Sequence, residues 1–305
     1  MRIKTLALVS LLTLVLTGCT TTPTATPTPT PFEGITIVAS TNVWGDVAQS
    51  VGGDLVQVVS IIDNFAQDPH SYEASARDQL AVNDADLVVA NGGGYDSFID
   101  TLAAAAGIGD VVYAFVGEEL EKEDDGHNHD HASGNEHVWY DFHVVESFAN
   151  KVAGRLGALD PDNSTKYSDN LGLFLNEIQI LEDRVAQASE SFAGSKVVSS
   201  EPVADYLLAE LGFENITPAS FAQAIEEELD VSPKDLLEIQ NLIKSKRINL
   251  FVINPQTGSV QIDGLIQLAK QNGIAVVELS ELLPPGQKYY EWMDLNIATL
   301  EAALR

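Results

Sequence analysis

Short apolar runs alternate with segments of helical periodicity in two groups along the chain, and this alternation limits the possible folds more than any other feature. The apolar runs have the length of buried strands, and the segments between them carry apolar residues at three- and four-residue intervals. Strands that alternate with helices are typical of parallel sheets with crossover helices. The first group of predicted strands covers 35–40, 56–62, 86–90 and 111–115, and the second covers 196–200, 249–254 and 275–279.

Between the two groups lies the longest periodic stretch of the chain, residues 163–192, whose apolar residues fall on one helical face. Two shorter helices broken near Gly172 are the alternative, but one glycine costs only about 1 kcal/mol in a helix. We therefore predict an α/β fold of two lobes of parallel-type sheet with flanking helices, 33–159 and 194–305, bridged by one long helix over 160–193. The other predicted helices cover 43–51, 75–82, 203–211, 234–245, 262–272 and 289–304.

The N-terminus predicts export from the cytoplasm. Two basic residues precede an apolar run over 6–16, which is shorter than the roughly 20 residues that a membrane span needs. The following Leu-Thr-Gly-Cys sequence resembles the bacterial lipobox. Residues 1–18 are therefore predicted to be a lipoprotein signal peptide, and 19–32 a lipidated Cys19 followed by a stalk rich in Thr and Pro. The alternative is a plain signal peptide in which Cys19 is incidental.

The charge of the chain excludes some classes of partner. Asp and Glu number 45 against 16 Lys and Arg, which gives a formal net charge of -29. Nucleic acids are not expected to bind, because their phosphates require basic patches. The single cysteine excludes an intrachain disulfide and a thiolate metal cluster.

Residues 118–134 form a polar insertion with no periodic apolar face, in which acidic residues precede His127, His129 and His131. Three of the six histidines of the chain therefore lie within the five positions 127–131. A solvated tether with a chance histidine cluster is one interpretation, and weak capture of metal ions is the other.

Four residues have the types and positions expected of metal ligands: His70, His137, Glu201 and Glu281. Glu201 and Glu281 directly follow predicted strands, and His70 lies between a predicted strand and a predicted helix. Ligands of parallel α/β sheets bind at the carboxyl ends of strands. Since the four residues come from both lobes, they predict a site in the cleft between the lobes. For His143 we predict a structural role, because its neighbours in the sequence do not suggest a metal site.

Three segments resemble motifs of a known family. They are 68–73 (Asp-Pro-His-Ser-Tyr-Glu), 136–141 (Glu-His-Val-Trp-Tyr-Asp) and 201–206 (Glu-Pro-Val-Ala-Asp-Tyr), and 289–293 is similar to the start of the family's last helix. The chain is identified on these motifs as a member of the metal-binding ABC-transporter solute-binding lipoproteins, the zinc and manganese receptor group. The resemblance covers nearly all of 33–305. It implies two α/β lobes joined by one long helix, with one divalent cation bound between them.

The resemblance also implies a ligand set. His70 and His137 match the two histidine ligands of the family. Glu201 stands where zinc receptors usually carry His and manganese receptors carry Glu. The last ligand is an acidic residue, for which Glu281 is preferred and Glu278 is the alternative. Two imidazoles and two carboxylates suit Zn, Mn or Fe(II) but not Cu(I). Neutral imidazole ligands need a hydrogen-bond acceptor on their other nitrogen to fix the tautomer, and Asp78 and Asp141 are the expected acceptors.

The predicted function is therefore that of a receptor, lipid-anchored outside the bacterial cell membrane, that captures a divalent metal and delivers it to an ABC transporter permease. A monomer is expected. Glu201 favours manganese, whereas the histidine-rich insertion and the higher affinity of Zn at most sites favour zinc, which we choose. A surface adhesin or zinc buffer is an alternative. A metallohydrolase, with Glu73 as base, is disfavoured because four protein ligands leave no open position. Affinity is expected to fall below about pH 6, where imidazoles become protonated.

Overall fold

Two four-stranded sheets carry the fold, and every strand pair in them is parallel. The computed structural model describes residues 32–65, 67–116, 134–227 and 229–304. In the first sheet the strand order is β2-β1-β3-β4, and in the second it is β6-β5-β7-β8. The first four strands are β1 (Ile35–Thr41), β2 (Val56–Ile62), β3 (Leu87–Gly92) and β4 (Val111–Phe115). The others are β5 (Lys196–Ser199), β6 (Glu214–Asn215), β7 (Leu250–Ile253) and β8 (Ala275–Glu278).

The central strands are apolar on both faces, as expected of parallel sheets covered by helices. Successive side chains of a strand point to opposite faces. In β1, Ile37 and Ala39 therefore belong to one apolar cluster while Val38 belongs to another. In β7, Leu250 and Phe251 divide in the same way between two clusters. This double burial explains why the strands appear in the sequence as continuous apolar runs.

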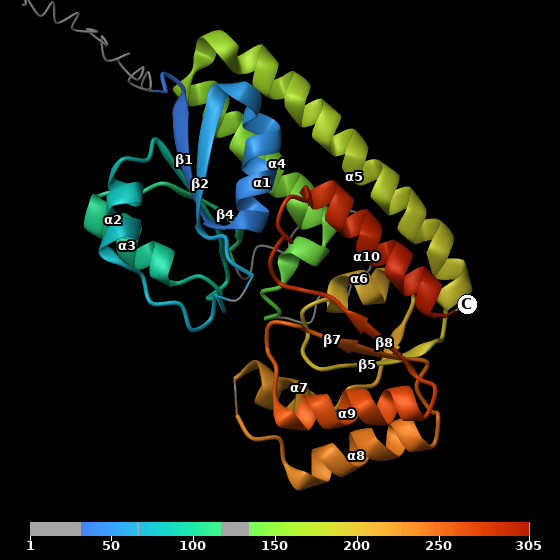
Figure 1. The fold of residues 1–305 in the computed structure, drawn as a ribbon. Helices are drawn as coiled ribbons and strands as arrows, with labels where there is room; N and C mark the ends of the chain where they lie inside the picture. The colour runs from blue at the N-terminus through green and yellow to red at the C-terminus, as the bar shows by residue number, and fades with distance from the viewer. Residues whose placement is uncertain (1–31, 66, 117–133, 228, 305) are drawn as a thin grey trace, which may run out of the picture. The chain divides into compact units, whose positions relative to one another are not determined.

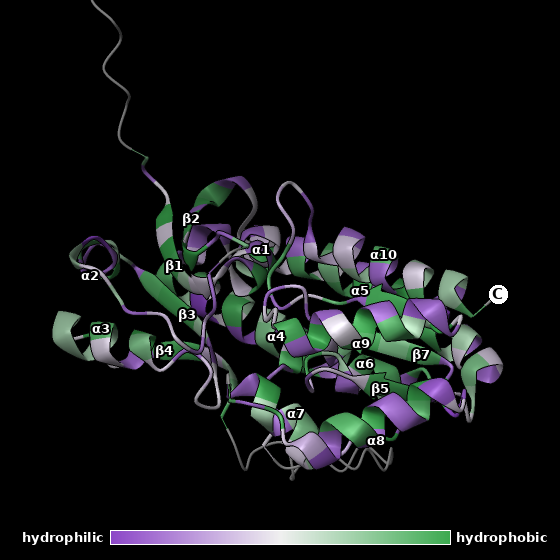
Figure 2. Cartoon of the chain, turned by 60° about the horizontal axis from the view of Figure 1, so that its bottom comes forward, coloured by the Kyte–Doolittle hydropathy of each residue, from purple (hydrophilic) through white to green (hydrophobic). Residues whose placement is uncertain are grey.

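Helices cover both faces of each sheet (Figure 1). In the first lobe α1 (Asn42–Gly52) and α4 (Phe142–Leu159) contribute to one apolar cluster, and α2 (Ala76–Asn83) and α3 (Phe98–Ala106) to the other. In the second lobe α6 (Asp205–Glu210) and α10 (Tyr289–Ala303) share the first of these clusters. The remaining helices pack on the opposite face: α7 (Ala219–Glu226), α8 (Pro233–Lys244) and α9 (Val260–Gln271). Figure 2 shows that these helices carry both hydrophobic and hydrophilic residues.

One helix of 29 residues, α5 (Ser164–Phe192), joins the two lobes (Figure 1). Its buried residues follow one face, and it packs against α1 and α4 of the first lobe and α6 and α10 of the second. Gly172 does not interrupt it. The prediction of two parallel-sheet lobes bridged by one long helix is confirmed.

The chain after β8 returns to the first lobe. Leu282 is buried in the apolar cluster that contains Val38 and Val88 of the first sheet. Asn42 at the start of α1 exchanges two hydrogen bonds with the backbone of Leu283, of 2.7 and 3.0 Å. The last segment therefore completes the core of the first lobe.

Sequence analysis did not identify α3, α4, α7 or β6. β6 has only two residues, both exposed, so no apolar run marks it. The buried residues of α4 do follow a helical spacing, so the sequence could have predicted this helix. None of the helices in the described ranges is both long enough and apolar enough to cross a membrane. The predicted signal peptide, Cys19 and the histidines at 127, 129 and 131 lie outside the described residues.

Candidate metal centre

The predicted ligands all follow the carboxyl ends of strands. His70 lies in the connection after β2, His137 lies after β4, Glu201 follows β5, and Glu281 follows β8. Because all strands in each sheet are parallel, these connections gather at one edge of their sheet. The two edges bring residues of both lobes into contact.

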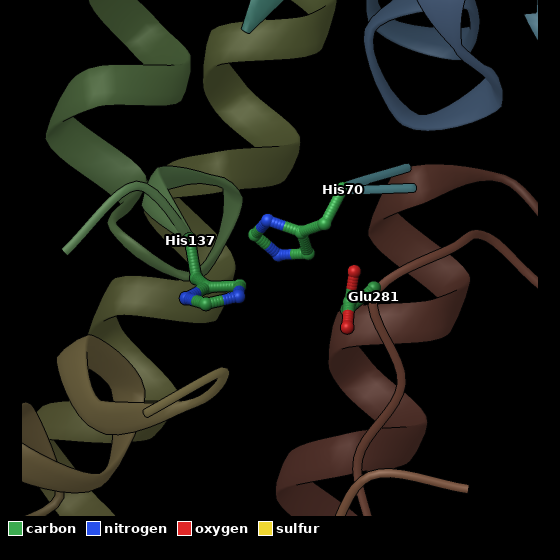
Figure 3. Close-up of side chains that lie close together, drawn as sticks. All are labelled: His70, His137 and Glu281. Carbon is green, nitrogen blue, oxygen red and sulfur yellow. The ribbon is translucent and has the colours of Figure 1, made fainter. Parts of the chain in front are cut away.

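The structure brings His70, His137 and Glu281 together. Each offers one donor atom, and these three atoms all lie within 4.8 Å of one another. Figure 3 shows the three side chains converging from different parts of the chain. His137 and Glu281 are buried, whereas His70 is exposed. A group of two nitrogens and one oxygen at this spacing can bind a single transition-metal ion.

His137 is held ready to donate a lone pair. Its Nδ1 lies 2.7 Å from Oδ1 of Asn135, and because a carboxamide oxygen only accepts hydrogen bonds, Nδ1 carries the proton. The other nitrogen, Nε2, is buried and has no hydrogen-bond partner among the described residues. Asn135 provides the acceptor that was expected of Asp78 or Asp141; Asp78 belongs to the capping box of α2, and Asp141 is the N-cap of α4. Fixing the tautomer through the far nitrogen is typical of ligating histidines.

Burial, together with the neighbouring His70, lowers the pKa of His137 to about 3. Its imidazole is therefore already neutral at pH values far below 6. The acid limit expected from imidazole protonation therefore does not come from His137.

Glu281 is positioned by both lobes. Tyr95, which follows β3, donates its hydroxyl to Oε2 at 2.9 Å, and Asn254, which follows β7, donates its side-chain amide to Oε1 at 2.6 Å. The backbone N–H of Glu281 donates to Oε1 of Gln256 at 2.8 Å. Burial raises the pKa of Glu281, and His70 and Tyr95 oppose that rise. Hydrogen bonds to both oxygens leave the carboxylate little freedom to rotate.

Glu201 lies beside the three converging donors without belonging to their group. Its Oε2 accepts a hydrogen bond of 3.3 Å from the same Asn254 amide that binds Glu281, and its Oε1 accepts one from the Thr257 hydroxyl. Burial and the neighbouring Glu281 raise the pKa of Glu201 to about 8. Two buried carboxylates that share one amide repel each other, and a bound dication relieves that repulsion.

Other predicted residues lie elsewhere. Glu278 is the exposed last residue of β8 and is outside the donor group that contains Glu281. His143 is not without partners: its Nδ1 lies 3.6 Å from Oε1 of Glu182, and Glu146 lies close to both. Sequence reasoning missed this contact because Glu182 belongs to the next helix, α5.

Sequence reasoning also missed Tyr95, Asn135 and Asn254. A usable signal existed for two of them, since Tyr95 and Asn254 follow the carboxyl ends of β3 and β7. Each is one of the two inner strands of its sheet, where ligand-binding residues concentrate.

A family model described as zinc-uptake complex component A, periplasmic, matches residues 37–303. The chain is 24% identical over 296 residues to the manganese ABC transporter substrate-binding lipoprotein scaA of Streptococcus gordonii, covering 88% of this chain and 89% of that one. It is 25% identical over 301 residues to the iron ABC transporter substrate-binding lipoprotein MtsA of Streptococcus pyogenes serotype M1, covering 89% of each. The solved structure of the periplasmic zinc-binding protein TroA from Treponema pallidum aligns with a TM-score of 0.73 at 18% identity, over 89% of this chain and 99% of that one.

Proposed function

We infer the function from one premise: the chain belongs to the family of zinc-uptake complex component A, periplasmic. We propose that it is the extracytoplasmic receptor of an ABC transporter, which binds one divalent transition-metal ion and delivers it to the permease. The observation that carries the proposal is the convergence of His70, His137 and Glu281 within 4.8 Å, with Nε2 of His137 buried and unpartnered. A buried polar atom without a partner is costly unless a ligand satisfies it.

We propose zinc as the ion. Two imidazoles and one carboxylate suit zinc, which binds more tightly than manganese at most sites with nitrogen and oxygen donors. Glu201 would complete a four-ligand set by moving from its bonds with Thr257 and Asn254 to the ion. The presence of this second carboxylate favours manganese or Fe(II) as the alternative, because additional oxygen donors suit the harder ions.

Competition titration tests the choice of ion. Protein purified without added metal is analysed for bound ions, stripped with a chelator, and titrated with Zn²⁺ and Mn²⁺ under equal free-metal buffering. We expect tighter binding of Zn²⁺. Tighter binding of Mn²⁺ would reverse the choice, and binding of neither ion would overturn the proposed function.

Cell experiments test delivery and anchoring. Deleting the gene should lower zinc uptake, whereas unchanged uptake would favour a surface adhesin or a zinc buffer. We further propose that Cys19 carries the lipid anchor, so Cys19→Ser should release a monomeric protein from the membrane fraction. Continued membrane attachment would contradict lipidation at this residue.

The proposed receptor role includes no catalytic step. Glu73, the base considered for a hydrolase, is exposed and is not part of the described donor group. A receptor needs an ion that is held and later released, and four protein ligands around zinc leave no position for an attacking water.

A further inference from the structure

A second group of donors adjoins the first and shares His70 with it. Donor atoms of His70, Glu136 and Glu226 also lie within 4.8 Å of one another. Glu136 directly precedes the inner ligand His137, and Glu226 is the last residue of α7 in the second lobe. Both lobes therefore contribute to this outer group, as they do to the inner one.

The two groups differ in burial. The inner partners of His70 are His137 and Glu281, which are 0% and 1% exposed. The outer partners are Glu136 and Glu226, whose side chains are 22% and 23% exposed. His70 is the one exposed member of the inner group. An ion that exchanges between solvent and the inner group therefore meets His70 first, where the two outer carboxylates also lie.

The outer carboxylates lack strong cationic partners in the described part of the chain. Their ion-pair contacts there are 3.8 Å from Glu136 to Nδ1 of His70 and 3.9 Å from Glu226 to Nδ1 of His137. That nitrogen of His137 is already hydrogen-bonded to Asn135. Two carboxylates so close together repel each other, and a divalent cation between them converts the repulsion into attraction.

We propose that His70, Glu136 and Glu226 form an outer binding position that a divalent metal ion occupies on its way into the inner site. This inference rests on the proposed function, because it requires that the inner group binds the ion. The ion first replaces part of its water shell with the two outer carboxylates and His70. It then exchanges those carboxylates for His137 and Glu281 while His70 remains close to it. Retaining protein donors throughout avoids the cost of a bare ion in a buried site.

Such an intermediate position has a distinctive kinetic signature. Its loss raises the barrier for entering and for leaving the inner site by the same amount, so both rates fall while the equilibrium Kd stays the same. Loss of long-range electrostatic attraction acts differently, because it slows association and weakens Kd.

The test uses the double variant Glu136→Gln and Glu226→Gln with Zn²⁺ alone as the probe. Association is followed by stopped-flow tryptophan fluorescence, since Trp139 lies against His137 with ring centroids 5.2 Å apart. Dissociation is followed by transfer of the ion to a chelating dye. The matched control is Glu73→Gln with Glu227→Gln, which removes the same charge from two exposed positions close in sequence to His70 and Glu226.

Relative to the control, we expect both rate constants of the double variant to fall about tenfold, equivalent to about 1.4 kcal/mol of barrier, with Kd unchanged. Rate constants equal to those of the control would overturn the outer position. A slower association accompanied by a weaker Kd would also overturn it, in favour of a purely electrostatic effect. Failure of the unmodified protein to bind either Zn²⁺ or Mn²⁺ would instead overturn the proposed function, so the two failures are distinguishable.

Discussion

The two lobes share one strand order but supply different donors to the site. In each sheet the second strand along the chain lies at the edge, followed by the first, third and fourth. From this common frame the first lobe presents the imidazoles of His70 and His137 at the candidate site, and the second presents the carboxylate of Glu281, with Glu201 beside it. A similar backbone thus presents imidazole nitrogens on one side and carboxylate oxygens on the other.

The two kinds of donor are also supported differently. Among the described residues, the side-chain nitrogens of the imidazoles are held by one short hydrogen bond, from His137 to Asn135. The carboxylates are held by Tyr95, Asn254 and Thr257. The comparison has a physical explanation, because a buried neutral ring needs only a fixed tautomer whereas a buried carboxylate must be compensated at both oxygens.

The largest effect is expected from removing a buried imidazole. His137→Ala deletes a proposed ligand whose Nε2 is buried, and we expect Zn²⁺ affinity to fall at least about 100-fold, beyond the range typical of outer partners. Isothermal titration or chelator competition measures the loss. His143→Ala is the matched control, since it removes an exposed histidine from α4. An unchanged Kd in His137→Ala would remove this residue from the site.

A smaller effect is expected from loosening a carboxylate. Tyr95→Phe deletes the hydroxyl that binds Oε2 of Glu281 and leaves the ligand itself in place. We expect affinity to fall about tenfold, at the lower end of the effects of outer partners. The control is Tyr113→Phe, which removes a hydroxyl bound to Asp100 away from the site. If Tyr95→Phe binds Zn²⁺ as tightly as the unmodified protein, the hydrogen bond from Tyr95 to Glu281 is not required for metal binding.

The buried carboxyl group of Glu201 should also make the stability of the metal-free protein depend on pH. The pKa of Glu201 is about 8 in the folded protein, above its ordinary value of 4.5. Between these values the folded metal-free chain binds more protons than the unfolded chain, so its free energy of unfolding contains a contribution that decreases as pH rises. The thermal midpoint of the stripped protein is expected to decrease by a few degrees from pH 5 to pH 8. Added Zn²⁺ should restore more stability at pH 8 than at pH 5.

Substitution tests the source of this trend. Glu201→Gln should flatten the decrease, whereas Glu238→Gln, on an exposed face of α8, should not. An equal decrease in both variants would assign the trend to other carboxyl groups, such as Glu210 and Glu226, whose pKa values burial also raises to about 7, rather than to Glu201.

The smallest effect is expected from the histidine-rich insertion. Deleting 121–133 should leave the Kd of the tight site unchanged and remove only weak additional binding, because the described donors lie outside this segment. Titration with excess Zn²⁺ measures both. Loss of tight binding would place the main site in the insertion.

The fold was predictable because its strands are buried on two faces and its longest helix is amphipathic. Residues such as Val38 and Val198 belong to continuous apolar runs, and the spacing of Phe174, Ile178 and Leu181 follows one helical face. By contrast, β6 is formed by exposed residues that pair with β5 through their backbones. Such an element carries no apolar signal in its own sequence.

The site was predictable only in part. His70, His137 and Glu281 were proposed from their types, their positions after strands and a family resemblance, and the structure brings them together. The roles of Tyr95 and Asn254 depend on which oxygen of Glu281 each one reaches. Those contacts join residues that are far apart in the sequence, so spacing alone does not reveal them.

The return of the chain to the first lobe has a consequence for the order in which the molecule is assembled. Leu282 and the backbone of Leu283 complete contacts with strands and helices that begin near residue 37. The half of the molecule that is synthesised first therefore lacks part of its core until nearly the whole polypeptide has emerged. Contacts so distant along the chain form slowly. The contacts that join Asn42 and Val38 to residues 282–283 are therefore among the last that the growing chain can form.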